Sequence, residues 1–183
     1  MQESEKGLTP RDITFGAVGI ALLAVSGWIT VSLGPIPFTL QTMALIFEVV
    51  ALSPRQSVLS VFGFLVLGGV GLPLFGGMSG GVSSLLGPAG GFLFGFGLGV
   101  LAALPARRLM PEGVVRDVVI ALIVSVVVYA VGLAWFMYST GAGLAAAFAA
   151  CVAPFLVTDT IKAVCGITLA NAVRRAVPAL SLR

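Results

Sequence analysis

The sequence predicts an all-α integral membrane protein: one domain over residues 1–183, with six transmembrane helices and both termini in the cytoplasm. The chain is 58% hydrophobic and 9% charged, whereas a soluble domain carries about a quarter charged residues. Its mean hydropathy is +1.13, and its apolar residues form runs close to the ~20 residues that cross a bilayer. The third observation is that its basic residues fall on one predicted side of the membrane.

Breaks between the apolar runs set the first four spans. Pro10-Arg11-Asp12 leads into the first, because proline suits the first turn of a helix, and Gly34-Pro35-Ile36-Pro37 ends it. Ser53-Pro54-Arg55 separates a short second run from the third, which stops at Pro73. The stretch Pro105-Ala106-Arg107-Arg108 is expected to end the fourth run, since proline is unfavourable inside a helix. The six predicted spans are residues 13–33, 38–52, 57–72, 92–104, 114–138 and 154–177.

Two further segments lie between the spans. Residues 74–91 contain Gly76-Gly77, Gly80-Gly81 and Gly90-Gly91, and we expect a loop without secondary structure of its own that covers or binds a ligand. A flexible connector is the alternative. The last span is placed by Pro154, since proline costs about 3 kcal/mol inside a helix but little in its first turn. The alanine-rich stretch 144–150 is then a short helix over the outer mouth.

The basic residues give the orientation. With six spans and the N-terminus inside, nine of the ten lysines and arginines are cytoplasmic, and the three outer loops contain none. This distribution follows the positive-inside rule. The nine are Lys6, Arg11, Arg55, Arg107, Arg108, Arg116, Arg174, Arg175 and Arg183. The tenth basic residue is Lys162, which lies within the last span.

Lys162 and Asp159 are the candidate functional pair. Residues three apart on a helix share a face, with Cβ atoms roughly 5–6 Å apart. An ionisable group at membrane depth costs on the order of 2.5–3.5 kcal/mol or more unless it is paired or hydrated, so such groups usually mark a functional cavity. A structural pair that only fixes helix packing is the alternative. Because both residues lie near the start of the last span, which begins on the outer side, we expect them in the outer half of the membrane.

Other polar residues within the spans have two interpretations each. Glu48 lies near the inner end of the second span, where it is expected to reach interfacial water or Arg55 in a structural role. Thr39, Gln41 and Thr42 open that span at the depth of Asp159, and they serve either as hydrogen bonds between helices or as part of a polar pocket. Cys151 and Cys165 are some 21 Å apart on a helix and form no disulfide.

Absent residues exclude several classes of enzyme. The sequence has no histidine, which removes Ser–His–Asp catalysis and His-containing zinc and haem sites. Its glycine-rich segment lacks the Gly-Lys-Ser/Thr of a nucleotide-binding loop. The carboxylate of Asp159 keeps Lys162 protonated, the wrong state for a general base. We therefore expect a protein that is not an enzyme and has no cofactor or metal.

Several segments resemble the BioY family, the biotin-specific S components of energy-coupling factor (ECF) transporters. The resemblance covers essentially the whole chain, in order, and it rests on four motifs. They are Gly34-Pro35-Ile36-Pro37-Phe38-Thr39-Leu40-Gln41-Thr42, Gly68-Gly69-Val70-Gly71-Leu72-Pro73-Leu74-Phe75, the glycine-rich run from Ser79-Gly80-Gly81 to Gly87-Pro88-Ala89-Gly90-Gly91, and Asp159-x-x-Lys162.

The resemblance implies an S-component-like bundle in the bacterial cytoplasmic membrane that binds biotin from the outer side. Asp159 and Lys162 would contact biotin, with Gln41, Thr39, Ser79 and Ser83 as further substrate-binding residues. Ala17 and Ala21 of the first helix would dock a transmembrane T component, to which two ATPase subunits attach. The alternative is a self-sufficient secondary carrier of a small carboxylate-bearing solute that uses Asp159 and Lys162 as a proton relay; an intramembrane enzyme is a distant third.

Overall fold

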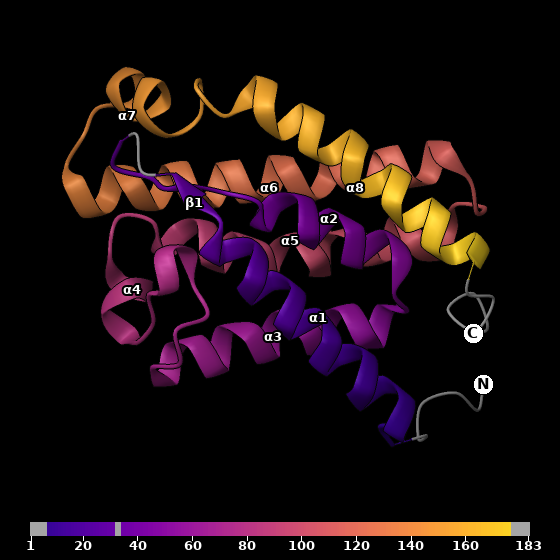
Figure 1. The fold of residues 1–183 in the computed structure, drawn as a ribbon. Coiled ribbons are helices and arrows are strands. Elements are labelled where there is room, and N and C mark those ends of the chain that lie inside the picture. The colour runs from indigo at the N-terminus through magenta and orange to yellow at the C-terminus, as the bar shows by residue number, and fades with distance from the viewer. Residues whose placement is uncertain (1–6, 32–33, 177–183) are drawn as a thin grey trace.

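The computed structural model describes residues 7–31 and 34–176, and in these ranges the chain is mostly helical (Figure 1). The described residues form eight α-helices, joined by short connections, one 3-10 turn and a hairpin whose two strands have two residues each. The elements are α1 (Pro10–Trp28), β1 (Thr30–Val31), β2 (Phe38–Thr39), α2 (Gln41–Ala51), α3 (Pro54–Val70), η1 (Gly76–Met78), α4 (Val82–Leu86), α5 (Gly90–Leu109), α6 (Val114–Thr140), α7 (Leu144–Cys151) and α8 (Leu156–Ala176).

The long helices form a bundle with two distinct ends (Figure 1). Helix pairs α5–α6, α1–α3 and α2–α8 pack side by side. The start of α1, the end of α8 and the α5–α6 connection lie at one end, and β1, α4 and α7 lie at the other. We call the first the arginine end, because the described arginines lie there: Arg11, Arg55, Arg107, Arg108, Arg116, Arg174 and Arg175. The predicted positions of Lys6 and Arg183 lie outside the described residues.

Within the described residues, four helices are long and apolar enough to cross a membrane: α1, α5, α6 and α8. The other two apolar helices are shorter, with 17 residues in α3 and 11 in α2. At 1.5 Å per residue α2 extends only about 16 Å, roughly half the hydrocarbon thickness. A membrane helical bundle is therefore established for the described chain, and the prediction of exactly six full crossings stays a prediction.

The first two predicted spans are too long at their facing ends. Helix α1 ends at Trp28, and the β-branched Thr30 and Val31 instead pair as a strand with Phe38 and Thr39. β-branched side chains favour an extended backbone, and the prolines that follow cannot continue a helix. The hairpin therefore supplies the backbone hydrogen bonds that a helix would have supplied here. Residues 32–33, the predicted end of the first span, lie outside the described part.

The boundaries of α5 and α8 also differ from the predicted ones, for local reasons. Helix α5 runs through Pro105 to Leu109, so the prediction that Pro105 ends it is wrong. Membrane helices tolerate an internal proline because leaving the helix would expose more backbone groups than the one bond lost. Pro154 lies in the turn before α8, which begins at Leu156. The predicted end at residue 177 lies outside the described residues.

Glycines on one face of α5 allow its close approach to α6. A Cβ atom on Gly91 would lie 2.2 Å from Trp135 Cβ, and one on Gly95 would lie 2.9 Å from the Cα of Val128. Gly99 repeats the contact one turn further, against Val124. Four-residue spacing of small residues brings helix backbones together in membranes. Of the described helix pairs, α5–α6 has the most extensive contact.

Glu48 joins the three helices α1, α2 and α3. Its carboxyl group is fully buried, and Ser60 donates a 2.5 Å hydrogen bond to its Oε2. Gly19 of α1 lies directly against this pair, since a Cβ there would meet Ser60 Oγ at 2.3 Å. The prediction that Glu48 reaches interfacial water is wrong, because the packing of α1 against α3 encloses it. Its predicted structural role agrees with this position.

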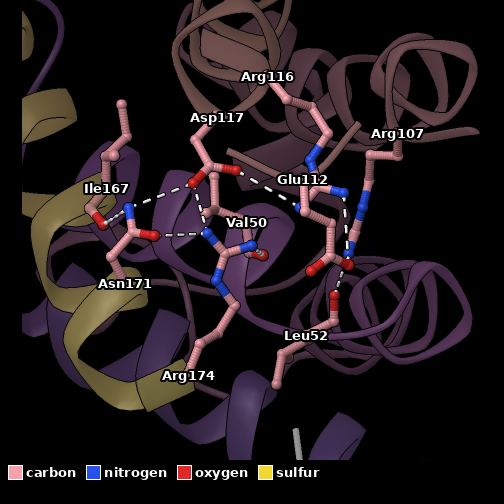
Figure 2. Close-up of polar contacts among 9 residues, drawn as sticks. All are labelled: Val50, Leu52, Arg107, Glu112, Arg116, Asp117, Ile167, Asn171 and Arg174. Atoms are coloured by element: carbon pink, nitrogen blue, oxygen red, sulfur yellow. Dashed lines mark hydrogen bonds and ion pairs between the residues drawn. The ribbon is translucent and has the colours of Figure 1, made fainter. Parts of the chain in front are cut away.

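A polar cluster fastens the arginine end (Figure 2). Asp117 of α6 is fully buried and pairs with Arg174 of α8 and, at 3.7 Å, with Arg116. Asn171 donates to the same carboxylate at 3.2 Å and accepts from Arg174 at 2.6 Å. Arg174 also donates to the Val50 carbonyl at the end of α2. The cluster thereby connects α2, α6 and α8 at one level of the bundle.

We expect Gly95→Ala to lower the melting temperature in detergent, because its methyl group would collide with the α6 backbone at a cost of about 1–3 kcal/mol. The control is Gly97→Ala in the same helix, where the new Cβ meets only the ends of the Leu65 and Phe62 side chains. Equal melting temperatures for the two variants would contradict the close α5–α6 contact.

We expect Asp117→Asn to destabilise the fold by about 3 kcal/mol, because it leaves the partly buried Arg174 without its anionic partner and the buried Arg116 with the exposed Glu112 alone. Glu112→Gln is the matched control: Glu112 pairs with Arg116 at 3.6 Å, but its side chain is 57% exposed, and such pairs contribute about 1 kcal/mol or less. Thermal unfolding of both variants in detergent measures the difference. A larger effect for Glu112→Gln would contradict this account.

Candidate functional site

A cavity of about 270 Å³ lies between α2, α5, α6, α8 and the segments at the α7 end. Most of its wall is apolar, contributed by residues such as Phe92, Phe96 and Val128. Its size and character are those of a small-molecule site with a few polar groups that fix orientation. The polar and charged side chains in its wall are those of Thr39, Gln41, Thr42, Ser79, Ser84, Tyr129, Asp159 and Lys162.

The predicted ion pair lies in this wall. Lys162 Nζ is 2.8 Å from Asp159 Oδ1, and the two side chains are 7% and 13% exposed. Asp159 lies in the first turn of α8, where the helix dipole favours a negative charge. The expectation that residues three apart would share a face is confirmed. Because α8 begins at Leu156 instead of Pro154, the pair is nearer to the helix start than predicted.

Two further helices hold the Asp159 carboxylate. Tyr129 of α6 donates its hydroxyl proton to Oδ2 at 2.7 Å, and Thr42 of α2 donates to Oδ1 at 3.2 Å. Together with Lys162, three donors from three helices therefore converge on one carboxylate. This convergence fixes its position in the cavity wall, because each oxygen is bound from a different direction.

The ammonium group of Lys162 also contacts an aromatic ring. Its Nζ lies 3.7 Å from the centroid of Phe38, within the range of a cation–π interaction. Phe38 in turn stacks on Phe155, with centroids 5.9 Å apart. The strand β2 and the turn before α8 therefore meet at this lysine. A protonated amine is stabilised here by one carboxylate and one ring face, which leaves part of its donor capacity for a ligand.

The glycine-rich segment forms an ordered wall of the cavity. Against the expectation of a loop without its own structure, it contains η1, α4 and a bridge between Phe75 and Ser79. Phe75 is buried and packs edge-on against Phe64 of α3 at 5.3 Å. Gly77 has a φ of +68°, which favours glycine at that turn. The segment is thus anchored in the core by one phenylalanine.

Both tryptophans of the chain bind carbonyl groups of the connecting segments at the α7 end. Trp28 of α1 donates its indole N–H to the Pro73 carbonyl at 2.7 Å, and Trp135 of α6 donates to the Gly87 carbonyl at 2.9 Å. These carbonyls lie before and near the end of the glycine-rich segment. The two hydrogen bonds therefore tie the two sides of the segment to two different helices.

Most of the predicted site residues lie together. Gln41, Thr39 and Ser79 line the cavity with Asp159 and Lys162. Ser83 is exposed and does not line the cavity. Its neighbour Ser84 lines the cavity instead. The predicted docking residues Ala17 and Ala21 are on the exposed face of α1, away from the cavity.

Sequence reasoning missed Tyr129 and the phenylalanines that close the site. Tyr129 is one of two tyrosines in the chain and lies within the long apolar run of α6. A tyrosine hydroxyl in such a run needs a hydrogen-bond partner, which was the available signal. Phe38 and Phe155 gave no such signal in the sequence, because apolar residues are common throughout this chain.

Residues 1–179 match the family model described as the BioY family. The chain belongs to the BioY family. Among its BioY relatives, "Probable biotin transporter BioY" of Pyrococcus horikoshii is 34% identical over 161 residues, which covers 88% of this chain and 94% of the relative. "Biotin transporter BioY" of Rhizobium etli is 33% identical, covering 96% of this chain and 100% of the relative. These relatives are named as transporters, in agreement with the prediction that this BioY chain is not an enzyme.

The fold agrees with a solved structure. A crystal structure of "the S-component for biotin from an ECF-type ABC transporter" superposes with a TM-score of 0.82, over 92% of this chain and 95% of that one, at 24% sequence identity. This BioY chain therefore shares the helical fold of that structure, and its several long apolar helices make it a multi-pass membrane protein.

Proposed function

We propose that this chain is a high-affinity biotin-binding S component that mediates biotin uptake with energy from partner subunits. The observation that carries the proposal is the Asp159–Lys162 ion pair in the wall of an otherwise largely apolar cavity, in a chain of the BioY family. A charged pair enclosed by apolar helices is costly to maintain, and a ligand with matching polar groups gives it a function.

Biotin has the chemistry that this wall selects. Its ureido ring offers two N–H donors and one carbonyl acceptor. The carboxylate of Asp159 accepts from an N–H and the ammonium of Lys162 donates to the carbonyl, each in a charge-assisted hydrogen bond. Gln41, Thr39 and Ser79 supply neutral polar contacts, and Ser84, in place of the predicted Ser83, covers the site. The sulfur-containing ring and the tail of biotin pack on the apolar wall formed by residues such as Phe92, Phe96 and Val128.

In this proposal the domain of residues 1–183 crosses the cytoplasmic membrane six times, with both termini and the arginine end in the cytoplasm. The concentration of arginines at one end supports this orientation through the positive-inside rule. The cavity then opens on the outer side. The 11-residue α2 crosses together with its extended flanks or where the bilayer is locally thin.

Energy enters through partners. A transmembrane T component docks on α1, where Ala17 and Ala21 present small side chains on an exposed face. Two ATPase subunits attached to it drive release of biotin into the cytoplasm. The chain itself needs no cofactor; biotin is its cargo.

The alternative is a self-sufficient carrier in which Asp159 and Lys162 relay protons for a small carboxylate-bearing solute. Uptake of labelled biotin into cells separates the two mechanisms. An S component with its partners takes up biotin when the proton gradient is dissipated and ATP is maintained, whereas a proton-coupled carrier stops.

Isothermal calorimetry of the purified protein in detergent tests the proposed cargo. We expect one-to-one nanomolar binding of biotin, weakened at least tenfold by Asp159→Asn and by Lys162→Met, because each removes a charge-assisted hydrogen bond. Thr160→Val is the control: Thr160 is exposed on the same helix and its hydroxyl donates to the Leu156 carbonyl.

No heat of binding from a folded sample would refute the assignment of biotin as cargo. If biotin binds tightly and neither substitution weakens binding, biotin remains the assigned cargo, but the ion pair has only a structural role. Weakening by Thr160→Val to the same degree would show that any change in α8 disturbs binding.

Cysteine labelling tests the orientation. In a Cys151→Ala, Cys165→Ala background, we expect Ser139→Cys, at the exposed end of α6, to react with a membrane-impermeant maleimide in intact cells. Pro111→Cys, in the α5–α6 connection, should react only after permeabilisation. The reverse pattern would place the arginine end outside.

A further inference from the structure

The Asp159 carboxylate has little hydrogen-bonding capacity left for a ligand. An ionised carboxylate accepts about four hydrogen bonds, two at each oxygen. Lys162 and Thr42 both donate to Oδ1, and Tyr129 donates to Oδ2. Three of the four acceptor positions are therefore occupied by the protein. One position, on Oδ2, remains.

Lys162 is committed in a similar way. One of its three N–H donors points to Asp159 Oδ1, and its ammonium lies against the Phe38 ring. The ion pair thus presents a single acceptor position beside a donor. Both side chains are largely buried, so water has limited access to these groups.

From these contacts we infer that Tyr129 is a positioning residue. Together with Thr42, it restrains Asp159 so that the carboxylate accepts a hydrogen bond from one ligand N–H. Asp159 and Lys162 then bind an adjacent N–H and C=O of a cyclic urea at the same time. The inference rests on the proposed function and deepens it, because it predicts that the two ureido N–H groups of biotin are recognised unequally. One forms a charge-assisted bond to Asp159, and the other meets neutral groups.

The neutral candidates for the second N–H are themselves partly engaged. Gln41 is 4% exposed; its Nε2 donates to the Leu23 carbonyl at 3.4 Å, and its Oε1 accepts from Thr39 at 3.3 Å. A bond from the second N–H to such a group lacks the charge assistance that Asp159 provides. The two N–H groups therefore contribute unequally to affinity.

The first test uses two biotin analogues in which one or the other ureido N–H is replaced by CH₂, which gives two isomeric lactams of nearly the same shape. We expect one lactam to bind within about tenfold of biotin and the other to bind at least tenfold more weakly still, because only the latter loses the bond to Asp159. Equal losses for the two isomers would overturn the inference.

The second test is Tyr129→Phe, measured with biotin by calorimetry. Loss of the hydroxyl should weaken binding about tenfold, because Asp159 loses the donor that holds Oδ2. Tyr138→Phe is the matched control, since Tyr138 is on the same helix and is 84% exposed. It should leave the affinity unchanged.

A double-mutant cycle separates positioning from a general structural effect. In the Asp159→Asn background, measured at higher ligand concentration, adding Tyr129→Phe should change the affinity less than twofold, because the hydroxyl has no carboxylate left to restrain. The same tenfold loss in both backgrounds would show that Tyr129 acts independently of Asp159 and would overturn the inference.

The two proposals fail in different ways. If the folded wild-type protein does not bind biotin, the proposed function fails and this inference falls with it. If biotin binds tightly and Tyr129→Phe binds it equally well, the cargo stands and only the role of Tyr129 is wrong.

Discussion

A charge enclosed by apolar helices must find its partners within the protein, and this constraint shapes both ends of the bundle. At the cavity, Lys162, Thr42 and Tyr129 surround Asp159. At the arginine end, Arg174 and Asn171 surround Asp117 (Figure 2). Each carboxylate is bound from more than one helix, so neutralising the charge also fixes how α2, α6 and α8 pack.

The two clusters differ in what they leave open. Asp117 is fully buried, and two of its partners also bond to main-chain carbonyls: Arg174 to Val50 of α2 and Asn171 to Ile167 of α8. Asp159 and Lys162 keep a small exposed fraction and border a cavity. The same chemistry is therefore used once to lock helices together and once to present polar groups to a ligand. The packing around each pair, and not its charge, makes the difference.

Sequence reasoning succeeded where the signal is local. The spacing of Asp159 and Lys162 and the helix start at Pro10 both depend on neighbours along the chain. It failed where the third dimension decides. Nothing near Tyr129 in the sequence indicates Asp159, which is 30 residues away, and Gly91, Gly95 and Gly99 do not stand out among 24 glycines. The hairpin that shortens α1 likewise depends on pairing across a turn.

The chain has two tryptophans, and both indole groups bind carbonyls that flank or belong to the glycine-rich segment beside the cavity. One fluorophore is on α1 and one is on α6, so their emission reports on both sides of this segment. A rearrangement of this segment would alter the polarity around both rings without an introduced dye. The protein thus contains its own optical reporter of this segment, which forms part of the cavity wall.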